Sequence, residues 1–230
     1  MRQGHRRWHW VGLLAVACTG AGEQAPLGCP VQSLTWVARY QLLEPSECPV
    51  LPGELLGVQS FEAPGQGRFL SVKPDTLTAL DERDPEPSRF PYALGRLPET
   101  ADADNVCAVE ELSVAEQHAP AQARPPLPEL RAAYLWQNVR LIERPDAPGL
   151  QLSAELELTL NGCTAHYEVW ALYPGTVTCK GAQGEPDDSV CRDSRLLHPD
   201  FDTVCDPTLL RCVPARRPPS FKDSALRGAR

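Results

Sequence analysis

The sequence predicts a mainly β protein, either an antiparallel β-sandwich or a partly open barrel, followed by a disulfide-braced, loop-rich C-terminal segment. Apolar and polar residues alternate over several short segments, which is the pattern of half-buried strands. Turn-forming Gly, Pro and Asn residues separate these segments. The 230 residues include nine cysteines and 24 prolines, and so many cysteines indicate an oxidising, extracytoplasmic compartment.

Residues 1–17 have the features of an export signal: a start with three arginines and no acid, then a short apolar stretch. The following junction, Leu14-Ala15-Val16-Ala17-Cys18, resembles the lipobox of bacterial lipoproteins, although Leu14 stands one place further from the Cys than is usual. The resemblance implies cleavage before Cys18 and acylation of its thiol, with palmitate as a typical acyl group. Residues 18–31 would then form a lipid-anchored tether. The alternative is an ordinary secretory signal, cleaved near Ala17 or Ala21.

Without Cys18 the number of cysteines is even, which favours four disulfides. The candidates are Cys29, Cys48, Cys107, Cys163, Cys179, Cys191, Cys205 and Cys212. No two of them have the C-x-x-C spacing that structural zinc sites usually need, so we expect no metal site. We favour two short local bridges, Cys205 with Cys212 and Cys179 with Cys191, and leave the other four cysteines open.

The β domain is expected to span residues 32–178. Alternation of apolar and polar residues predicts its first strand at Gln32 to Leu43. Two shorter strands are predicted at Glu54 to Phe61 and Arg68 to Lys73, joined by a Pro- and Gly-containing hairpin loop at 63–67.

The middle of the domain is less regular. Residues 74–91 are rich in Pro and acidic residues, which predicts an exposed loop. Ser113 followed by Glu116 fits a capping box, so a short helical turn is expected over 113–118. Residues 119–130 contain four prolines and are expected to form an extended linker within the domain.

A three-stranded antiparallel meander is predicted between Tyr134 and Tyr173. Leucine alternates with polar residues from Leu150 to Leu160, and Asn161-Gly162 is a preferred pair for a two-residue hairpin turn. With that turn every facing pair is apolar: Leu160 with Cys163, Leu158 with Ala165, Leu156 with Tyr167, Ala154 with Val169, Leu152 with Ala171, and Leu150 with Tyr173. A slip of one residue would lose this agreement, so the register is specified.

The same register separates groups that might otherwise look catalytic. Cys163 is directed to the core and His166 to the outside, opposite Glu157, so they cannot form a nucleophile and base or half a metal site. Glu155 stands opposite Glu168, a like-charge pair that is unfavourable unless a cation or a third residue lies between them.

The C-terminal part is predicted to comprise a Cys-rich segment, 179–213, packed on the β domain, and a basic, flexible tail, 214–230. The whole chain has a formal charge of −8. Cleavage of the signal makes this −11, divided into −16 on the body and +5 from Arg211 onward. The tail can be solvated, or it can contact anionic lipid or the acidic body of its own chain. A nucleic-acid partner is excluded by the acidic surface.

Catalytic signals are few. The sequence has no zinc-protease, nucleophile-elbow, phosphate-loop or dinucleotide motif, and we expect no catalytic residue and no cofactor. Acidic clusters, such as Asp102 with Asp104, are interpreted as solvated loops. Ser194, His198 and Asp200 are the residues on which an envelope hydrolase would have to depend.

Several motifs together resemble an uncharacterised group of Cys-rich lipoproteins from bacteria of the myxobacterial kind. They are the lipobox-like start, the Trp/Tyr-containing first strand between Cys29 and Cys48, the stretch from Asp102 to Cys107, the Asn161-Gly162-Cys163 hairpin, and the segment from Pro199 to Pro214. The resemblance implies outer-membrane anchoring, since Thr19 is not the Asp that often retains lipoproteins in the inner membrane. It implies no catalytic residues.

The leading hypothesis is therefore an exported lipoprotein of the cell envelope that acts as a structural or binding module. Its membrane contact would be the N-terminal lipid, and an envelope protein or polysaccharide would be its partner. The alternatives are an envelope hydrolase and a secreted, disulfide-rich binding protein without an anchor, which would occupy the periplasm or the medium.

Overall fold

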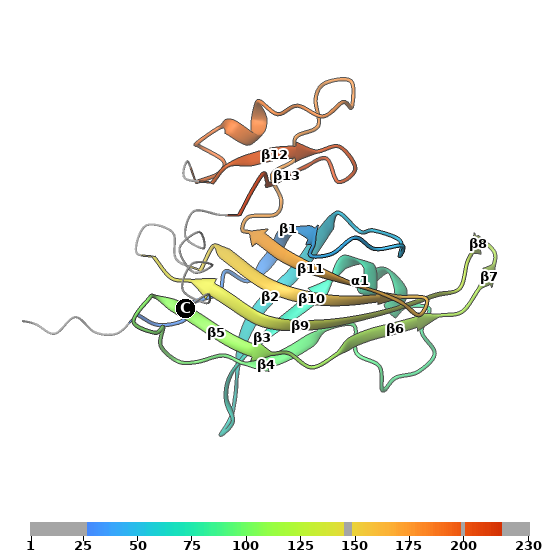
Figure 1. The fold of residues 1–230 in the computed structure, drawn as a ribbon, viewed down its shortest axis with the longest axis horizontal. Coiled ribbons are helices and arrows are strands. Elements are labelled where there is room, and N and C mark those ends of the chain that lie inside the picture. Colours follow the sequence, from blue (N-terminus) through green and yellow to red (C-terminus); the bar gives the residue numbers. More distant parts are fainter. Residues whose placement is uncertain (1–26, 145–148, 199–200, 218–230) are drawn as a thin grey trace, which may run out of the picture.

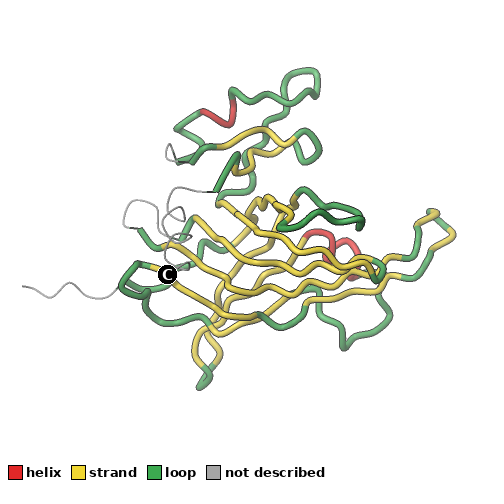
Figure 2. Tube along the Cα trace, in the orientation of Figure 1, coloured by secondary structure: helices red, strands yellow, loops and turns green. Residues whose placement is uncertain are grey.

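The computed structural model describes residues 27–144, 149–198 and 201–217 (Figure 1). Strands dominate these residues, and helix is confined to two short segments (Figure 2). In chain order the elements are β1 (Leu34–Leu42), β2 (Gly53–Ala63), β3 (Gly67–Pro74), α1 (Asp75–Asp81), β4 (Ala93–Arg96), β5 (Val106–Glu111), β6 (Ala115–Ala119), β7 (Gln122–Ala123), β8 (Pro126–Leu127), β9 (Leu130–Ile142), β10 (Gln151–Leu160), β11 (Cys163–Leu172), the 3-10 helix η1 (Val190–Arg192), β12 (Thr203–Asp206) and β13 (Arg211–Pro214).

Nine strands form one antiparallel sheet that nearly closes into a barrel. Their order is β4-β3-β2-β1-β11-β10-β9-β5, and β6 pairs with the first half of β9 beside β5. The two edges meet where Ser113 N–H donates to Leu94 O at 2.8 Å and Leu94 N–H donates to Ser113 Oγ at 2.9 Å. The partly open barrel expected from the sequence is thus confirmed.

The β10–β11 hairpin has the predicted register. Leu160 faces Cys163, Leu156 faces Tyr167 and Leu152 faces Ala171. Asn161 and Gly162 form the turn with φ of 50° and 83°, the left-handed conformation that a two-residue hairpin turn requires and that Asn and Gly tolerate best. The strong alternation of the sequence and this turn therefore agree in specifying one pairing.

Strand β9 contains a bulge that the predicted meander did not include. Its buried residues alternate as far as Trp136 and then resume at Val139, because Gln137 and Asn138 are both directed outward. The pairing with β10 shifts at the same place, and Asn138 has a φ of 50°. A bulge increases the local twist of a strand, and this one curves the sheet between β10 and β5.

The barrel interior is filled by a continuous apolar core. Four of its large side chains are completely buried: Trp36, Tyr134, Trp136 and Tyr167. Tyr40 packs against the last two of these rings, with centroid distances of 6.2 and 5.8 Å. Burial of one such aromatic or leucine side chain contributes about 1.5–3 kcal/mol, so the core is the main source of the barrel's stability.

The predictions for two segments in the middle of the domain were wrong. Residues 75–81, assigned to an exposed loop, form α1, because Leu77 and Leu80 lie on one helical face and pack into the core. Residues 113–118, assigned to a helical turn, lead into strand β6. Ser113 bonds to Leu94 of β4 instead of capping a helix, so tertiary pairing overrides the local capping signal.

The Pro-rich segment 119–130 is also different from the extended linker expected. Its strands β7 and β8 pair as a short hairpin, with Gln122 opposite Leu127. Figure 1 shows this hairpin projecting beyond the end of β9.

All eight cysteines that follow Cys18 form disulfides: Cys29–Cys107, Cys48–Cys163, Cys179–Cys205 and Cys191–Cys212. The set was predicted correctly, but the two local pairs that we favoured were wrong. Cys205 and Cys212 face each other in the β12–β13 ladder, and each is bonded to a cysteine outside that hairpin. The two disulfides therefore connect the hairpin to the preceding loop instead of closing short loops.

We call residues 177–214 the Cys-rich module. It lies beside β1 and β11 (Figure 1), and Arg39 of β1 donates from Nη1 to the carbonyl oxygens of Pro214 and Ala215 at 3.2 and 3.0 Å. Among the described residues, no helix is sufficiently long and apolar to cross a membrane.

Candidate functional site

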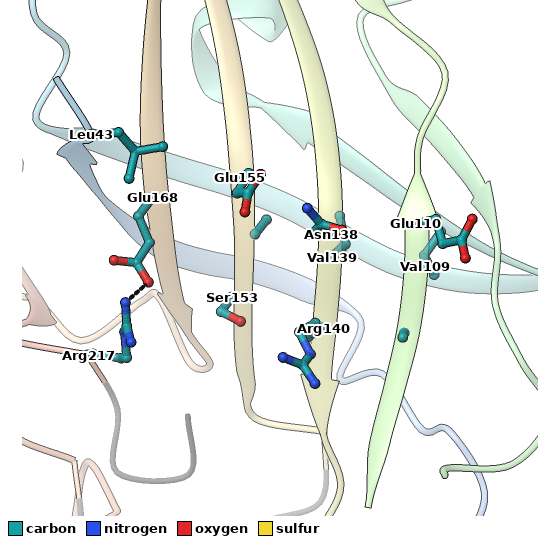
Figure 3. Close-up of a pocket in the computed structure, with 12 residues that line it drawn as sticks. Leu43, Val109, Glu110, Asn138, Val139, Arg140, Ser153, Glu155, Glu168 and Arg217 are labelled. Carbon is teal, nitrogen blue, oxygen red and sulfur yellow. Dashed lines mark hydrogen bonds and ion pairs between the residues drawn. The ribbon is translucent and has the colours of Figure 1, made fainter. Parts of the chain in front are cut away.

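The outer face of the barrel carries a hollow of about 530 Å³ over β11, β10, β9 and β5. Figure 3 shows its polar side chains rising from neighbouring strands toward the same space. Its lining residues are Leu43, Ala108, Val109, Glu110, Asn138, Val139, Arg140, Ser153, Ala154, Glu155, Glu168 and Arg217. We call it the outer-face hollow.

Strand pairing explains why these side chains gather. Ser153 of β10 stands opposite Arg140 of β9, which in turn stands opposite Ala108 of β5. In a second row Glu155 stands opposite Glu168 of β11. Facing residues on adjacent strands lie about 5 Å apart, so each row places its side chains on one continuous surface. The small residues Ser153 and Ala108 leave room between the longer ones.

The bulge of β9 adds a further polar group to this surface. Asn138 is exposed and lines the hollow, whereas Val139 next to it is buried. If the same residues followed an unbroken alternation without the bulge, Trp136 and Arg140 would be directed to the same side of the sheet, and one of them would be on the wrong side. The bulge therefore keeps the core intact while presenting Asn138 and Arg140 together.

The facing carboxylates of Glu155 and Glu168 were expected to repel each other unless a cation lay near them, and the structure places one there. It is the guanidinium of Arg217, which forms an ion pair with Glu168 and is drawn with that bond in Figure 3. Glu155 and Glu110 have no ion-pair partner within the described parts of the chain. The hollow is thus a mixed-charge surface with an acidic excess that Arg217 reduces.

The Cys-rich module positions Arg217. The two hydrogen bonds from Arg39 fix the chain at Pro214 and Ala215, and Arg216 Nε lies 2.8 Å from Asp202 Oδ2. These contacts direct the chain from the end of β13 across β11 to the rim of the hollow. The contacts of β13 and of residues 214–215 with β1 and β11 are what bring a basic residue there.

A second polar group is enclosed by the barrel. Glu54 of β2 is only 4% exposed. Its Oε1 accepts hydrogen bonds from Tyr40 Oη at 3.0 Å and Tyr134 Oη at 2.8 Å, and its Oε2 accepts one from Thr76 N–H at 2.7 Å. These bonds connect β1, β2 and β9 to the start of α1, so the arrangement fixes the helix against the barrel.

Burial determines the protonation of this cluster. Desolvation raises the pKa of Glu54, and the hydrogen bonds from Thr76, Tyr134 and Tyr40 oppose part of that increase. Desolvation and the nearby Glu54 carboxyl also raise the pKa of both tyrosines, which therefore remain protonated donors. A carboxyl so enclosed is suited to structural hydrogen bonding and not to contact with a dissolved substrate.

The residues of the hydrolase alternative lie in the Cys-rich module. Ser194, His198 and Asp202 line one hollow of about 370 Å³, while Asp200 is outside the described residues. Asp202 is engaged by Arg216, and the His198 ring lies 5.2 Å from that of Phe201. The structure thus places Ser194 and His198 on one hollow, with Asp202 paired to Arg216 beside them.

The cysteines and acidic loops also have structural roles. Cys179, Cys191 and Cys212 bring their sulfurs close together, but each is in a disulfide and so is not a thiolate ligand. Asp102 Oδ1 accepts hydrogen bonds from the backbone N–H groups of Asp104 and Val106 at 2.8 and 2.9 Å, which stabilises a turn before β5.

The predicted divergence of Cys163 and His166 is confirmed. Cys163 is bonded to Cys48, and His166 stands opposite Glu157 with Nδ1 4.0 Å from Oε2. Cys18, the predicted lipidation site, lies outside the described residues.

Most of the outer-face hollow was not identified from the sequence. The positions of Glu155 and Glu168 were predicted, but Asn138, Arg140 and Glu110 were not. One signal was present: the apolar alternation of residues 132–141 shifts by one place at Gln137-Asn138, which indicates a bulge and hence two consecutive outward residues. The contribution of Arg217 depends on the path of the module and has no local signal.

The comparisons with known proteins place these features in a family. A protein-family model described as MlpA matches residues 34–174, which is the barrel from the start of β1 to just past the end of β11. A Myxococcus xanthus protein named "Putative lipoprotein MlpA" is 31% identical over 227 residues, covering 92% of this chain and 94% of its own length. No solved structure matches the chain.

Proposed function

The chain belongs to the MlpA family, and from this premise we propose that it is a lipid-anchored protein of the cell envelope that acts by binding. The name of the Myxococcus xanthus relative supports the lipoprotein assignment. The export signal at residues 1–17 and the lipobox-like sequence ending in Cys18 support it independently. We place the anchor in the outer membrane, because Thr19 follows the cysteine.

The contacts of the first described residues indicate that a lipid anchor at Cys18 would hold the barrel close to the membrane. Leu27 O accepts a hydrogen bond from Ala101 N–H at 2.8 Å, and Cys29 is joined to Cys107 at the start of β5. Only residues 18–26 separate the lipid from this fixed point. Nine residues span about 30 Å at most, so the barrel would lie close to the bilayer surface.

The outer-face hollow carries the binding part of the proposal. It is built on paired strands, which hold side chains more rigidly than loops do, and it combines charged, polar and small residues. The barrel interior, in contrast, is filled by Trp36, Tyr134 and Trp136. We therefore infer that recognition takes place on the outer surface, with an envelope protein or polysaccharide as the partner.

Anchoring is tested by expressing Cys18→Ser and a matched Thr19→Ser variant. The Thr19→Ser protein should remain in the membrane fraction, with an intact mass that begins at an acylated Cys18. The Cys18→Ser protein should lose the acyl mass and be recovered as soluble protein with its disulfides intact. If processed Cys18→Ser protein remained in the membrane fraction, the lipid anchor would be disproved.

Binding is tested by filling the hollow. Ser153→Trp places a large ring between Arg140 and Glu155, whereas Thr159→Trp places the same ring on the same strand, about 20 Å away. Capture from envelope extract should retain the same species on the wild type and Thr159→Trp, and lose it on Ser153→Trp. Equal capture by all three proteins would show that the hollow is not the binding surface.

A further inference from the structure

We propose that the part of the basic tail that lies outside the described residues, 218–230, occupies the outer-face hollow of its own chain and neutralises the carboxylates there. This inference rests on the proposed function, because it names what fills the binding surface when no partner is bound. It is carried by four observations on the described residues: the place where the chain ends, the charges of the hollow, its dimensions and one exposed apolar side chain.

The described chain ends at the rim of the hollow. Arg39 holds the carbonyls of Pro214 and Ala215, and Arg217 is paired with Glu168, itself a lining residue. The last described residue therefore lies beside Glu168 of β11, with the remaining width of the hollow formed by β10, β9 and β5 (Figure 3).

Three carboxylates line the hollow against two cations, Arg140 and Arg217, and the basic tail complements the acidic excess that remains. Arg217 pairs with one of the three carboxylates that line the hollow, and Glu110 and Glu155 remain without a cationic partner among the described residues. Residues 218–230 contain Lys222, Arg227 and Arg230 but only one acid, Asp223. A lysine placed between Glu155 and Glu168 would also relieve the repulsion between these facing carboxylates.

The tail is also long enough to cross the hollow. Adjacent strands lie about 4.8 Å apart, so β10 is about 5 Å and β5 about 14 Å from β11. The five residues from Arg217 to Lys222 can span about 17 Å. Lys222 can therefore reach Glu155 and also Glu110 at the far side, while Arg227 and Arg230 have length to spare.

An exposed apolar residue gives the tail a second contact. Leu43 is 54% exposed and lines the hollow beside Glu168. Phe221 lies four residues beyond Arg217, which is within reach of Leu43 while the lysine that follows it reaches the carboxylates. Covering Leu43 would remove apolar surface from water, a favourable contribution of about 25 cal/mol per Å².

The consequence is a built-in competitor for the binding surface. A partner that uses the hollow must displace the tail, so the partner is expected to present cationic groups that pair with Glu110 and Glu155. A chain that ends at Arg217 would then bind a given cationic segment more tightly than the full chain.

Zero-length carbodiimide cross-linking of the full-length protein tests the inference. The chain contains three lysines, Lys73, Lys180 and Lys222, so a link from the tail is readily identified by mass spectrometry after digestion. Lys222 should be joined to Glu155 or Glu110. A mixture of isotopically light and heavy protein shows that the link is formed within one chain.

The double variant Glu110→Gln and Glu155→Gln should lose the link at least tenfold. The matched double variant Glu62→Gln and Glu99→Gln, exposed residues away from the hollow, should keep it. Links from Lys222 only to other carboxylates, links only between two copies, or no link from Lys222 would each overturn the inference. The readout needs neither a partner nor a membrane, so its failure is distinguishable from a failure of the anchor or of partner capture.

Discussion

In the barrel, buried side chains from all nine strands of the main sheet contribute to one continuous core. In the Cys-rich module the buried cluster is small, and four of its five residues are cysteines. The barrel therefore obtains its stability mainly from apolar burial. The module has little apolar surface to bury and depends on Cys179–Cys205 and Cys191–Cys212. The two regions therefore have separate sources of stability, although the hydrogen bonds from Arg39 join them.

The largest effect is expected from the longest covalent loop. Cys48 and Cys163 are 115 residues apart, and closing such a loop stabilises by about 5 kcal/mol in the chain-entropy treatment. Replacing both by serine should lower the free energy of unfolding of the barrel by a similar amount. Urea unfolding followed by tryptophan fluorescence measures this directly, since Trp36, Trp136 and Trp170 all lie in the barrel. An unchanged midpoint would contradict a role of this disulfide in barrel stability.

A smaller effect is expected from a single core side chain. Leu156 is 2% exposed and faces Tyr167, so Leu156→Ala should lower the stability of the barrel by about 3 kcal/mol. Leu197→Ala in the module, at 5% exposure, is the matched control. In the same fluorescence assay it should leave the barrel transition almost unmoved. If both substitutions shifted that transition equally, the two regions would share one core.

The smallest effect concerns pH and is confined to the barrel. The pKa of Glu54 is raised above its ordinary value of 4.5 by desolvation, so the folded state holds this proton to higher pH than the unfolded state. The stabilisation linked to that proton is complete below the unfolded pKa and is lost as the pH rises through the folded pKa. Wild-type stability relative to Glu54→Gln should therefore fall over that interval. A difference in unfolding free energy that does not vary with pH would contradict the assignment.

Elements of the fold could be predicted where neighbouring residues in the sequence specify them, and could not where contacts between distant segments decide. The β10–β11 register was predictable because six apolar pairs and the Asn161-Gly162 turn specify the same pairing. Helix α1 was not predictable, because its two buried residues, Leu77 and Leu80, lie in an acidic, Pro-flanked segment that is too short to show a repeated helical spacing of apolar residues. Ser113 illustrates the opposite case, a strong local signal that pairing with Leu94 overrides.

The candidate site was only partly predictable. Adjacent strands brought Glu155 and Glu168 together as expected, but Glu110 comes from β5, a strand that the sequence analysis did not assign. The pairs Cys179–Cys205 and Cys191–Cys212 could not be derived from spacing, because they depend on how the β12–β13 hairpin packs on the loop before it. The position of Arg217 at the hollow also depends on this packing, since the residue follows β13 in the chain.

The separate origin of stability in the two regions is tested most directly by peptide-resolved hydrogen exchange on a variant in which Cys179, Cys191, Cys205 and Cys212 are all serine. The barrel disulfides remain in this protein. We predict that peptides of η1, β12 and β13 lose their protection, while those of β9, β10 and β11 exchange as slowly as in the wild type. Loss of protection throughout β9–β11 would show that the barrel depends on the module, and would contradict the account.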